Sequence, residues 1–412
     1  MLSKKLIKVS EYYKSTTSLE ADERLSIEEL EILEKEFSKY IEVISKHSGA
    51  QLIQTQEYVG YIILPNHIIS ITPKIPQISF INMLRYAIGL VKIIPDYFEL
   101  SEDVNYYDII VLFFLEELEK LLYKGLNGGY KIYEDNLSCI RGKILFKEDL
   151  NQNYNRGDKV FCSYSELTTD ILENRIIKYT LYYLSQGYFL DNTIDSKLLN
   201  YYNRLEQIDL VPISSDTFKI IEYTPLNEHY RIILALSELL LRDASLDEET
   251  LGKKTAISFL VDMNALFEKF VVRLFQEKME TEKLSVEEQK VEYADITSNE
   301  LQLKLDILIS YKKKPTLILD TKYKEFEGTP EISHVAQLTL YSNSTGVENC
   351  CLIYAGKPKV ETHTYFLHHG IKLNILSFDL QASNRYEFES KCNNFINSVN
   401  LLLQPIIDKE KS

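Results

Sequence analysis

Two aspartates and a lysine in the C-terminal third of the chain have the types and spacing of a metal site. Asp306 and Asp320 each interrupt a short apolar run, and Lys322 follows two residues after the second aspartate. The three lysines at 312–314 separate the two runs and are typical of a tight turn between strands. If Lys313 is the apex, the two aspartates face each other with Cβ atoms about 5 Å apart. Lys322 then shares their face, because side chains alternate along a strand.

This arrangement predicts a particular chemistry. Two carboxylates so close repel each other unless a cation lies between them, and oxygen ligands with room for water suit Mg²⁺ or Mn²⁺. Such an ion can polarise a phosphodiester and activate a bound water, while Lys322 orients the nucleophile or stabilises the developing phosphate charge. We therefore expect metal-assisted phosphodiester hydrolysis, with Asp306 and Asp320 as metal ligands.

The Asp-x-Lys spacing alone is weak evidence, because it should occur about once per 300 positions by chance. The same spacing of an acid and a lysine recurs without a second acid on a paired apolar run, at Asp195-Ser-Lys197, Glu288-Gln-Lys290 and Glu389-Ser-Lys391. The alternative for Asp320 and Lys322 is an ordinary hairpin with a surface ion pair.

A predicted helix over 259–275, before the hairpin, contributes another acid. Glu268 lies along its apolar seam, where a carboxylate without a partner is unfavourable. A position facing the hairpin would explain it. The alternative is an ion pair on the flank of the helix, with Lys269 or Arg273.

A second predicted helix, starting near residue 333, follows the hairpin. Gln337 and Tyr341 are four residues apart on it and share one face. The alternative is a pair of polar residues exposed on the surface.

The chain as a whole predicts a mixed α/β protein in three parts. Residues 1–155 form a β-rich N-terminal domain with helices, 156–250 a helical connecting region, and 251–412 the domain that holds the hairpin. We place the first boundary near 151–157, where Asn, Gln and Gly cluster. In the first part, periodicity and turn residues predict helices over 27–44, 78–90 and 106–122 and strands over 51–53, 58–64, 68–72, 130–133 and 137–146.

Composition limits the partners and the compartment. The 412 residues carry a net charge of −15, so autonomous tight binding to DNA is not expected, and a partner or a local basic patch must hold it. No run approaches the roughly 18 apolar residues of a membrane span, and the N-terminus lacks a signal-peptide core, which predicts a cytoplasmic protein. The five cysteines are odd in number and lack CxxC spacing, as expected of reduced thiols.

Together these features resemble a known family. A Glu on a helix, an Asp on a strand, Asp-x-Lys on the next strand and Gln-xxx-Tyr on a later helix is the order of the PD-(D/E)xK nuclease fold in its RecB-like form. The chain resembles McrC, the nuclease subunit of McrBC modification-dependent restriction systems. Leu305 stands where the motif's name has proline. The matching stretches are Val59-Gly60, Ile71-Thr-Pro73-Lys74, Met83-Leu-Arg-Tyr86, Arg141-Gly-Lys143, Leu167-Thr-x-Asp170, Asn174-Arg175, Phe259-Leu-Val-Asp-Met263, Leu266-Phe-Glu268-Lys-Phe270-Val271 and Asp320-Thr-Lys322-Tyr-Lys324.

The resemblance implies a magnesium- or manganese-dependent endonuclease that cuts DNA containing methylated cytosine and works with a hexameric AAA+ GTPase, McrB. The absence of a GxxxxGK[ST] loop agrees, since Gly252-Lys253 lacks the upstream glycine needed to bind nucleotide. The resemblance also makes Glu268 a third metal ligand. It gives catalytic roles to the residues Glu268, Asp306, Asp320, Lys322, Gln337 and Tyr341.

In this family the N-terminal domain projects into the GTPase ring and stimulates its turnover. We expect residues 51–74 and 125–147 to be the projecting parts and Arg141 to contact the partner, the alternative being a solvated strand arginine. Two other functions stay open: a regulatory adaptor with a non-cleaving nuclease fold, and a freestanding DNA-repair nuclease. The modified base and any dimerisation of the complex also stay open.

Overall fold

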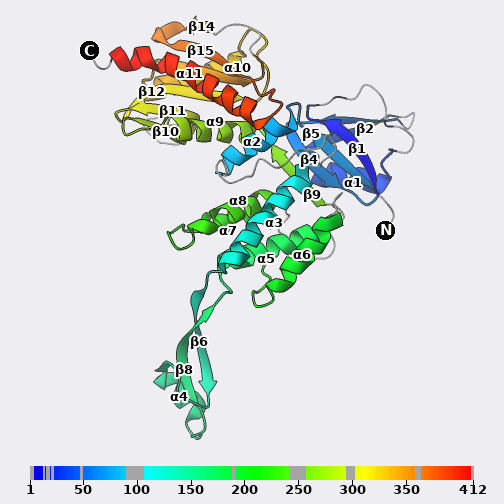
Figure 1. Cartoon of the computed structure of the whole chain (residues 1–412), viewed down its shortest axis with the longest axis vertical. Helices are drawn as coiled ribbons and strands as arrows, with labels where there is room; N and C mark the ends of the chain where they lie inside the picture. The colour runs from blue at the N-terminus through cyan, green and yellow to red at the C-terminus, as the bar shows by residue number, and fades with distance from the viewer. Residues whose placement is uncertain are drawn as a thin grey trace. The chain divides into compact units, whose positions relative to one another are not determined.

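The computed structural model falls into two compact units (Figure 1). One unit combines residues 1–99 with 260–412, and the other consists of residues 100–259. This division differs from the predicted one at 155 and 250, because the first 99 residues pack with the last 153 rather than with their neighbours in sequence. The Tyr86 ring, for example, meets Phe270 edge-on at 5.3 Å, and its hydroxyl donates to Glu389 at 2.9 Å. The structure describes residues 4–12, 14, 19, 23–46, 50–89, 106–187, 192–241, 257–293, 302–357 and 363–409.

The N-terminal part of the first unit is a small mixed sheet in the order β1-β5-β4-β9. Strands β4 and β5 are almost wholly buried, so the stretch 51–74 forms a core rather than a projecting part, contrary to our expectation. The elements are β1 (Lys5–Ser10), α1 (Ile27–Glu36), β2 (Ile41–Ser45), β3 (Gln51–Thr55), β4 (Tyr58–Ile63), β5 (His67–Thr72), α2 (Gln77–Ala87) and β9 (Ile257–Asp262).

Two predicted helices include residues that are strands in the structure. The helix predicted over 27–44 ends at Glu36, and Ile41–Ser45 pairs with Gln51–Thr55 as an antiparallel hairpin. The helix predicted over 259–275 begins only at Met263, after β9. In both cases a β-branched or aromatic run happens to match helical spacing, and pairing with another strand decides its structure.

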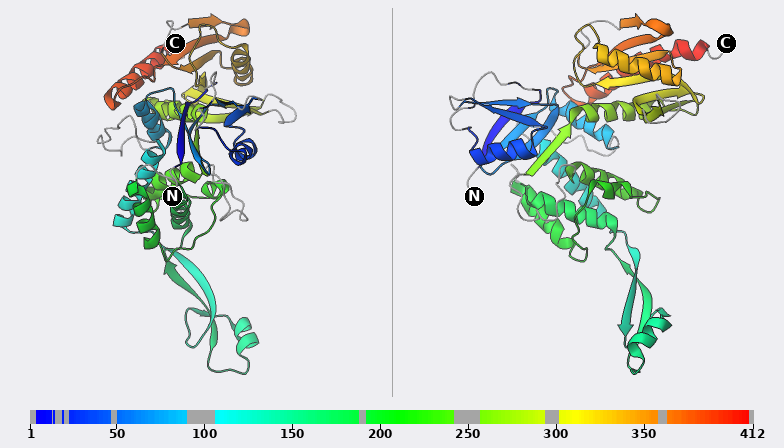
Figure 2. Two further views of the ribbon diagram at one scale, coloured as in Figure 1. Left: turned by 90° about the vertical axis from the view of Figure 1, so that its right-hand side faces the viewer. Right: turned by 180° about the vertical axis from the view of Figure 1, so that it is seen from behind.

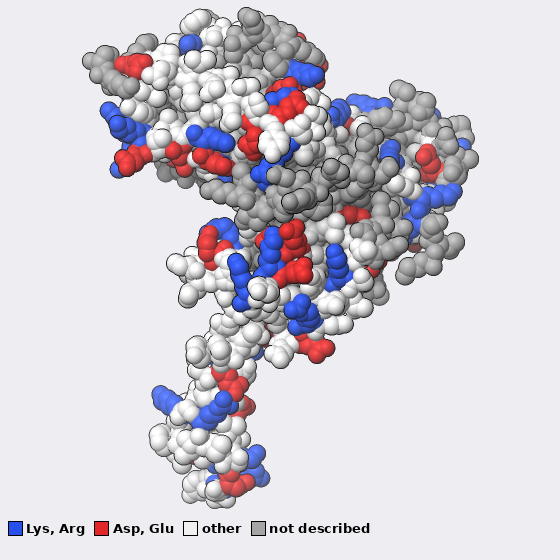
Figure 3. Space-filling view, in the orientation of Figure 1, with Lys and Arg blue, Asp and Glu red and all other residues white. Residues whose placement is uncertain are grey.

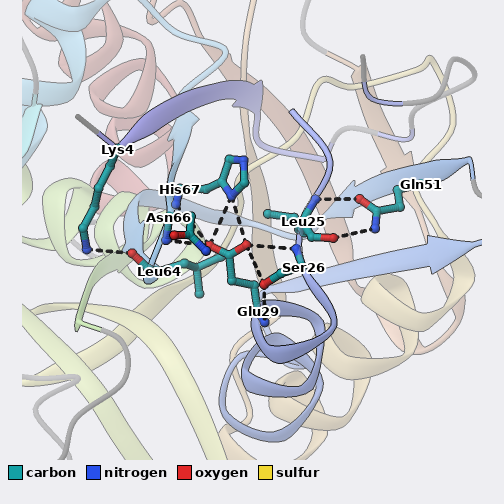
Figure 4. Close-up of polar contacts among 8 residues, drawn as sticks. All are labelled: Lys4, Leu25, Ser26, Glu29, Gln51, Leu64, Asn66 and His67. Carbon is teal, nitrogen blue, oxygen red and sulfur yellow. Dashed lines mark hydrogen bonds and ion pairs between the residues drawn. The ribbon is translucent and has the colours of Figure 1, made fainter. Parts of the chain in front are cut away.

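Glu29, on α1, ties the start of that helix to the β4–β5 turn (Figure 4). Its side chain is fully buried and accepts hydrogen bonds from the backbone nitrogens of Ser26 (3.0 Å), Asn66 (2.8 Å) and His67 (3.1 Å). The His67 ring adds a contact at 3.0 Å. Burial opposes ionisation of Glu29, but these hydrogen bonds outweigh it and lower the pKa of the carboxyl group.

We expect Glu29→Gln to lower the free energy of unfolding by on the order of 2 kcal/mol, because an amide nitrogen cannot accept from the buried N–H groups. Since the folded-state pKa is lowered, the carboxylate contributes stability above its ordinary pKa and loses it as pH falls through the folded value. Urea unfolding at neutral and acid pH measures both effects. Glu31→Gln, an exposed change on the same helix, is the control and should leave the midpoint unchanged.

The second part of this unit is a six-stranded mixed sheet in the order β10-β11-β12-β13-β15-β14. Helix α10 covers one face through Leu338 and Tyr341, which pack in a core with Ile318 and Leu352. Helices α9 and α11 share the opposite face, where Phe275 stacks on Phe395 at 6.0 Å. The elements are α9 (Met263–Met279), β10 (Leu284–Tyr293), β11 (Gln302–Tyr311), β12 (Lys314–Lys322), α10 (Ile332–Thr345), β13 (Asn349–Ala355), β14 (His363–Phe366), β15 (Lys372–Phe378) and α11 (Arg385–Lys409).

The second unit is a bundle of helices from which a long β-sheet arm extends, with its strands in the order β6-β8-β7 (Figures 1 and 2). In the arm, residues 129–168, β6 pairs with β8 over nine residues and α4 lies at the tip. The boundary predicted near 151–157 falls inside this arm, since strands on both sides of it pair with each other. The elements are α3 (Tyr106–Lys124), β6 (Gly129–Leu137), β7 (Lys143–Ile144), α4 (Phe146–Asn153), β8 (Val160–Thr168), α5 (Leu172–Ser185), α6 (Asn192–Arg204), α7 (Ser215–Lys219) and α8 (Arg231–Leu241).

The predicted mixed α/β class is therefore confirmed. Within the described residues, none of the helices combines the length and the apolar character needed to cross a membrane.

Candidate metal centre

The β11–β12 hairpin brings the two predicted aspartates together. Ile307 pairs with Leu319, and the same register continued by one residue sets Asp306 opposite Asp320. The turn itself is shorter than predicted, with Lys312 and Lys313 both in the left-handed region at φ 48° and 69°. A β-bulge between the turn and the aspartates compensates for the missing loop residue.

Asp320 is a buried carboxylate with few hydrogen-bond or ion-pair partners. Its side chain is 0% exposed, and Lys322 Nζ lies 2.7 Å from Oδ2 as an ion pair. Apart from Lys322, no described residue donates a hydrogen bond to either carboxylate oxygen of Asp320. Burial and the nearby charge of Asp306 raise the pKa of Asp320 to about 7, although Lys322 opposes the shift. The ion pair is thus buried, unlike the surface pair of the alternative interpretation.

Asp306 is half-buried and is anchored to the neighbouring strand. Its Oδ2 accepts a hydrogen bond from the backbone nitrogen of Thr321 at 3.0 Å. Thr321 lies between Asp320 and Lys322 in the sequence, so this hydrogen bond holds the Asp306 carboxylate near both residues. The two aspartates are close enough for the charge of Asp306 to act on Asp320.

Glu268 points toward the same region from α9. Its Oε1 accepts a hydrogen bond from Gln289 Nε2 at 3.1 Å, and burial together with the charge of Asp306 raises its pKa. Arg273, one of the predicted ion-pair partners, donates to Gln276 instead. Within the described part of the chain, no three or more His, Cys, Asp and Glu side chains form a group that could hold a metal. Glu268 as a third ligand therefore stays a prediction.

Gln337 and Tyr341 lie on the α10 face that covers the hairpin. Gln337 Nε2 donates to the Tyr341 hydroxyl at 2.7 Å, and that hydroxyl donates to the backbone carbonyl of Lys304 at 2.6 Å. Tyr341 is 4% exposed, so the two are not the surface pair of the alternative. These hydrogen bonds attach α10 to β11 two residues before Asp306. The catalytic role of Gln337 and Tyr341 stays a prediction.

His334 belongs to this region and was not singled out from the sequence. It lies 3.5 Å from the Tyr354 hydroxyl through Nδ1 and 3.4 Å from Glu331 through Nε2. Burial and the nearby charges of Lys322 and Lys324 lower its pKa, which favours the neutral ring. Its position three residues before Gln337, on the same helical face, is the sequence feature that could have identified it.

The residues present fit a divalent cation bound by two carboxylates. A buried acid whose one polar contact among the described residues is Lys322, next to a second acid, leaves oxygen lone pairs that a divalent cation can satisfy. Mg²⁺ in proteins commonly takes one or two carboxylates and keeps several waters, so a larger set of protein ligands is not required.

Comparison with known proteins identifies the family of this chain. A family model described as the McrBC 5-methylcytosine restriction system component matches residues 53–355. The chain belongs to this McrBC family. The Type IV methyl-directed restriction enzyme EcoKMcrBC of Escherichia coli strain K12 is 24% identical over 259 residues, which cover 61% of this chain and 74% of that protein. The predicted relationship to McrC is confirmed.

One solved structure resembles this McrC-family chain along most of its length. It is a refined half-complex from a tetradecameric assembly of Thermococcus gammatolerans McrB AAA+ hexamers with bound McrC. The matched chain has a TM-score of 0.64 and 19% identity, and the match covers 96% of the present chain and 100% of that one. At this identity the likeness shows a shared fold.

Arg141 lies in the arm of this McrC-family chain rather than in the metal centre. Its guanidinium forms an ion pair with Glu166 and lies over the Tyr164 ring, 4.4 Å from the centroid. Gly142 has φ 67°, and a Cβ there would lie 2.3 Å from the Ser163 carbonyl oxygen, so this close approach requires glycine. Arg141 as a partner contact stays a prediction, and half of its side chain is exposed.

We expect Mn²⁺ to raise the melting temperature more at pH about 8 than at pH about 5.5, because a carboxylate must lose its proton to bind a metal. Without metal, the raised pKa of Asp320 means that folding favours its protonated form. The stability that this group contributes is therefore lost as the pH rises from the ordinary pKa of an aspartate toward the raised pKa of Asp320, about 7. Asp320→Asn should remove the pH-dependent part of the metal effect, and an equal Mn²⁺ shift at both pH values would contradict the assignment.

Proposed function

We propose that this chain is the metal-dependent endonuclease subunit of a restriction system directed at modified cytosine. The observation that carries the proposal is the Asp320 carboxylate, buried beside Asp306 and satisfied by one lysine alone among the described residues. Structural ion pairs inside proteins normally have further hydrogen bonds, so this pair is better explained by a ligand than by stability. We take Mg²⁺ or Mn²⁺ as the ion and the PD-(D/E)xK nuclease as the fold.

Each side chain has a distinct proposed role. A bound divalent ion would supply Lewis acidity toward the scissile phosphate. Asp306 and Asp320 would hold this ion, and Lys322, which pairs with Asp320, would offer its ammonium group to the phosphate. Asp306 stays oriented by the Thr321 backbone, and Tyr341 keeps β11 from moving away. Lys322 would thereby help to orient the phosphate beside the two carboxylates.

The proposed partner is an AAA+ GTPase similar to McrB, and the arm supplies the surface for it. Figure 3 shows the arm, at the bottom of the view, with large uncharged areas. Many large apolar side chains exposed together on one narrow arm are typical of a surface that binds another protein. Those at least 60% exposed are Tyr130, Ile132, Ile140, Phe146, Leu150, Tyr154 and Leu167.

The proposed substrate is DNA that contains methylated cytosine, and the partner delivers it. The net charge of −15 makes it unfavourable for this chain to gather DNA phosphates without help. The partner then recognises the modified base, and the present chain cleaves the DNA.

The experiment co-expresses the chain with an McrB-like AAA+ GTPase and measures cleavage of methylated and unmethylated plasmids with Mg²⁺ and GTP. We expect cleavage of methylated DNA only when both proteins and GTP are present. Stimulated GTP hydrolysis without any cleavage would support the adaptor instead. Cleavage by the chain and Mg²⁺ alone would support a freestanding nuclease.

A further inference from the structure

The β11–β12 hairpin contains one more residue on β12 than on β11 between the turn and the aspartates. Next to the turn, Tyr311 pairs with Lys314 and Ser310 with Pro315. On the other side of the bulge, Ile309 pairs with Leu317. Thr316 is therefore the extra residue, with no counterpart on β11.

This extra residue decides which way Asp306 faces. If the register at the turn continued unbroken, Asp306 would lie opposite Leu319 rather than Asp320. A shift of one residue turns a side chain to the other face of a sheet, so the two carboxylates would then point to opposite faces. The bulge is what allows a two-residue turn and facing aspartates in the same hairpin.

The Thr316 hydroxyl closes the bulge. It accepts a hydrogen bond from the Tyr311 backbone nitrogen at 3.2 Å and donates one to the Lys314 carbonyl at 2.8 Å. The side chain is 3% exposed, so little water can replace it. One hydroxyl thus bridges the two strands at the point where the backbone ladder is interrupted.

We infer that Thr316 is a positioning residue for the metal centre, holding the register in which Asp306 faces Asp320. The inference rests on the proposed function, because it matters only if the two carboxylates share a ligand. Thr316 acts through the backbone of both strands and does not itself touch DNA or metal.

The test compares Thr316→Val, which keeps the shape and removes the hydroxyl, with Thr316→Ser, which keeps the hydroxyl. Thr180→Val is the matched control, since it removes another buried hydroxyl, one that donates to a carbonyl within α5. Three quantities are measured on the full chain: hydrogen exchange of the 307–319 hairpin, Mn²⁺ affinity by calorimetry, and cleavage with the GTPase partner.

We expect Thr316→Val to speed exchange in the hairpin and to weaken Mn²⁺ binding by about 10- to 100-fold, as outer-shell changes do at metal sites. Cleavage should fall by about 100-fold, as expected for a misplaced catalytic group. Thr316→Ser should recover most of each loss, and Thr180→Val should leave hairpin exchange and Mn²⁺ affinity as in the wild type.

Wild-type Mn²⁺ affinity and cleavage in Thr316→Val would overturn the inference and leave the proposed function intact. Equal losses in the Val and Ser variants would also overturn it, because the hydroxyl would not be the cause. If the wild-type chain itself neither binds Mn²⁺ nor supports cleavage, the proposed function fails, and the inference fails with it. The wild-type measurement therefore separates the two failures.

Discussion

Replacing Asp320 with Asn should reduce DNA cleavage by the reconstituted complex by about 1,000-fold or more, while GTP hydrolysis by the partner stays stimulated. The amide keeps the shape of the side chain but cannot balance the charge of a cation. Because Asp320 is buried and its pKa is raised, the substitution removes a destabilising charge in the metal-free protein. Loss of cleavage would therefore not come from loss of folding, and the stimulated GTPase rate verifies this.

The chain supplies its own matched control for this change. Asp195-Ser-Lys197 repeats the same spacing on α6, where both charged residues are exposed. Asp195→Asn should leave cleavage and GTP hydrolysis at wild-type rates. Cleavage by the Asp320→Asn complex within a fewfold of wild type would rule out Asp320 as the centre of the chemistry.

Removing apolar side chains from the tip of the arm should abolish stimulation of the partner GTPase. The double variant Phe146→Ser, Tyr154→Ser changes two residues that are 72% and 81% exposed, so the fold of the arm should survive. Aromatic side chains at the centre of an interface commonly contribute about 2 kcal/mol or more each, so the pair should weaken binding by several hundredfold or more. Titration of the chain into the GTPase, with GTP hydrolysis as the readout, measures this.

The control for the arm is another exposed apolar residue in the same unit. Leu199, on α6, is 60% exposed, and Leu199→Ser should leave stimulation unchanged. Wild-type stimulation by the double variant would show that the arm is not the surface that binds the partner. The metal centre should still bind Mn²⁺ in both variants, because no residue of the arm contributes to it.

The placement of the candidate site residues could largely be predicted from the sequence, because they lie on one hairpin and on two flanking helices. The facing aspartates agree with the prediction, but the predicted reason was wrong. We expected a three-residue loop around Lys313, whereas the structure has a two-residue turn and a bulge at Thr316. A pattern of alternation does not distinguish these, since each gives the same register beyond the bulge.

The other differences come from contacts that each segment makes with residues outside it. Ile41–Ser45 has helical spacing, but pairing with Gln51–Thr55 makes it a strand. The arm could not be predicted as one element, because β6 and β8 are joined by the Asn- and Gly-rich stretch that looked like a domain boundary. His334 was missed because its one sequence signal, a place three residues before Gln337 on the same helical face, does not show that Lys322 and Tyr354 lie near it.

Calorimetric titration of the purified chain with Mn²⁺, in the wild type and in Asp320→Asn, tests the metal centre most directly. We expect the wild type to bind Mn²⁺ with a measurable heat and the variant to lose that binding, while Asp195→Asn binds as the wild type does. The same affinity in the wild type and in Asp320→Asn would contradict a metal-dependent centre at this hairpin.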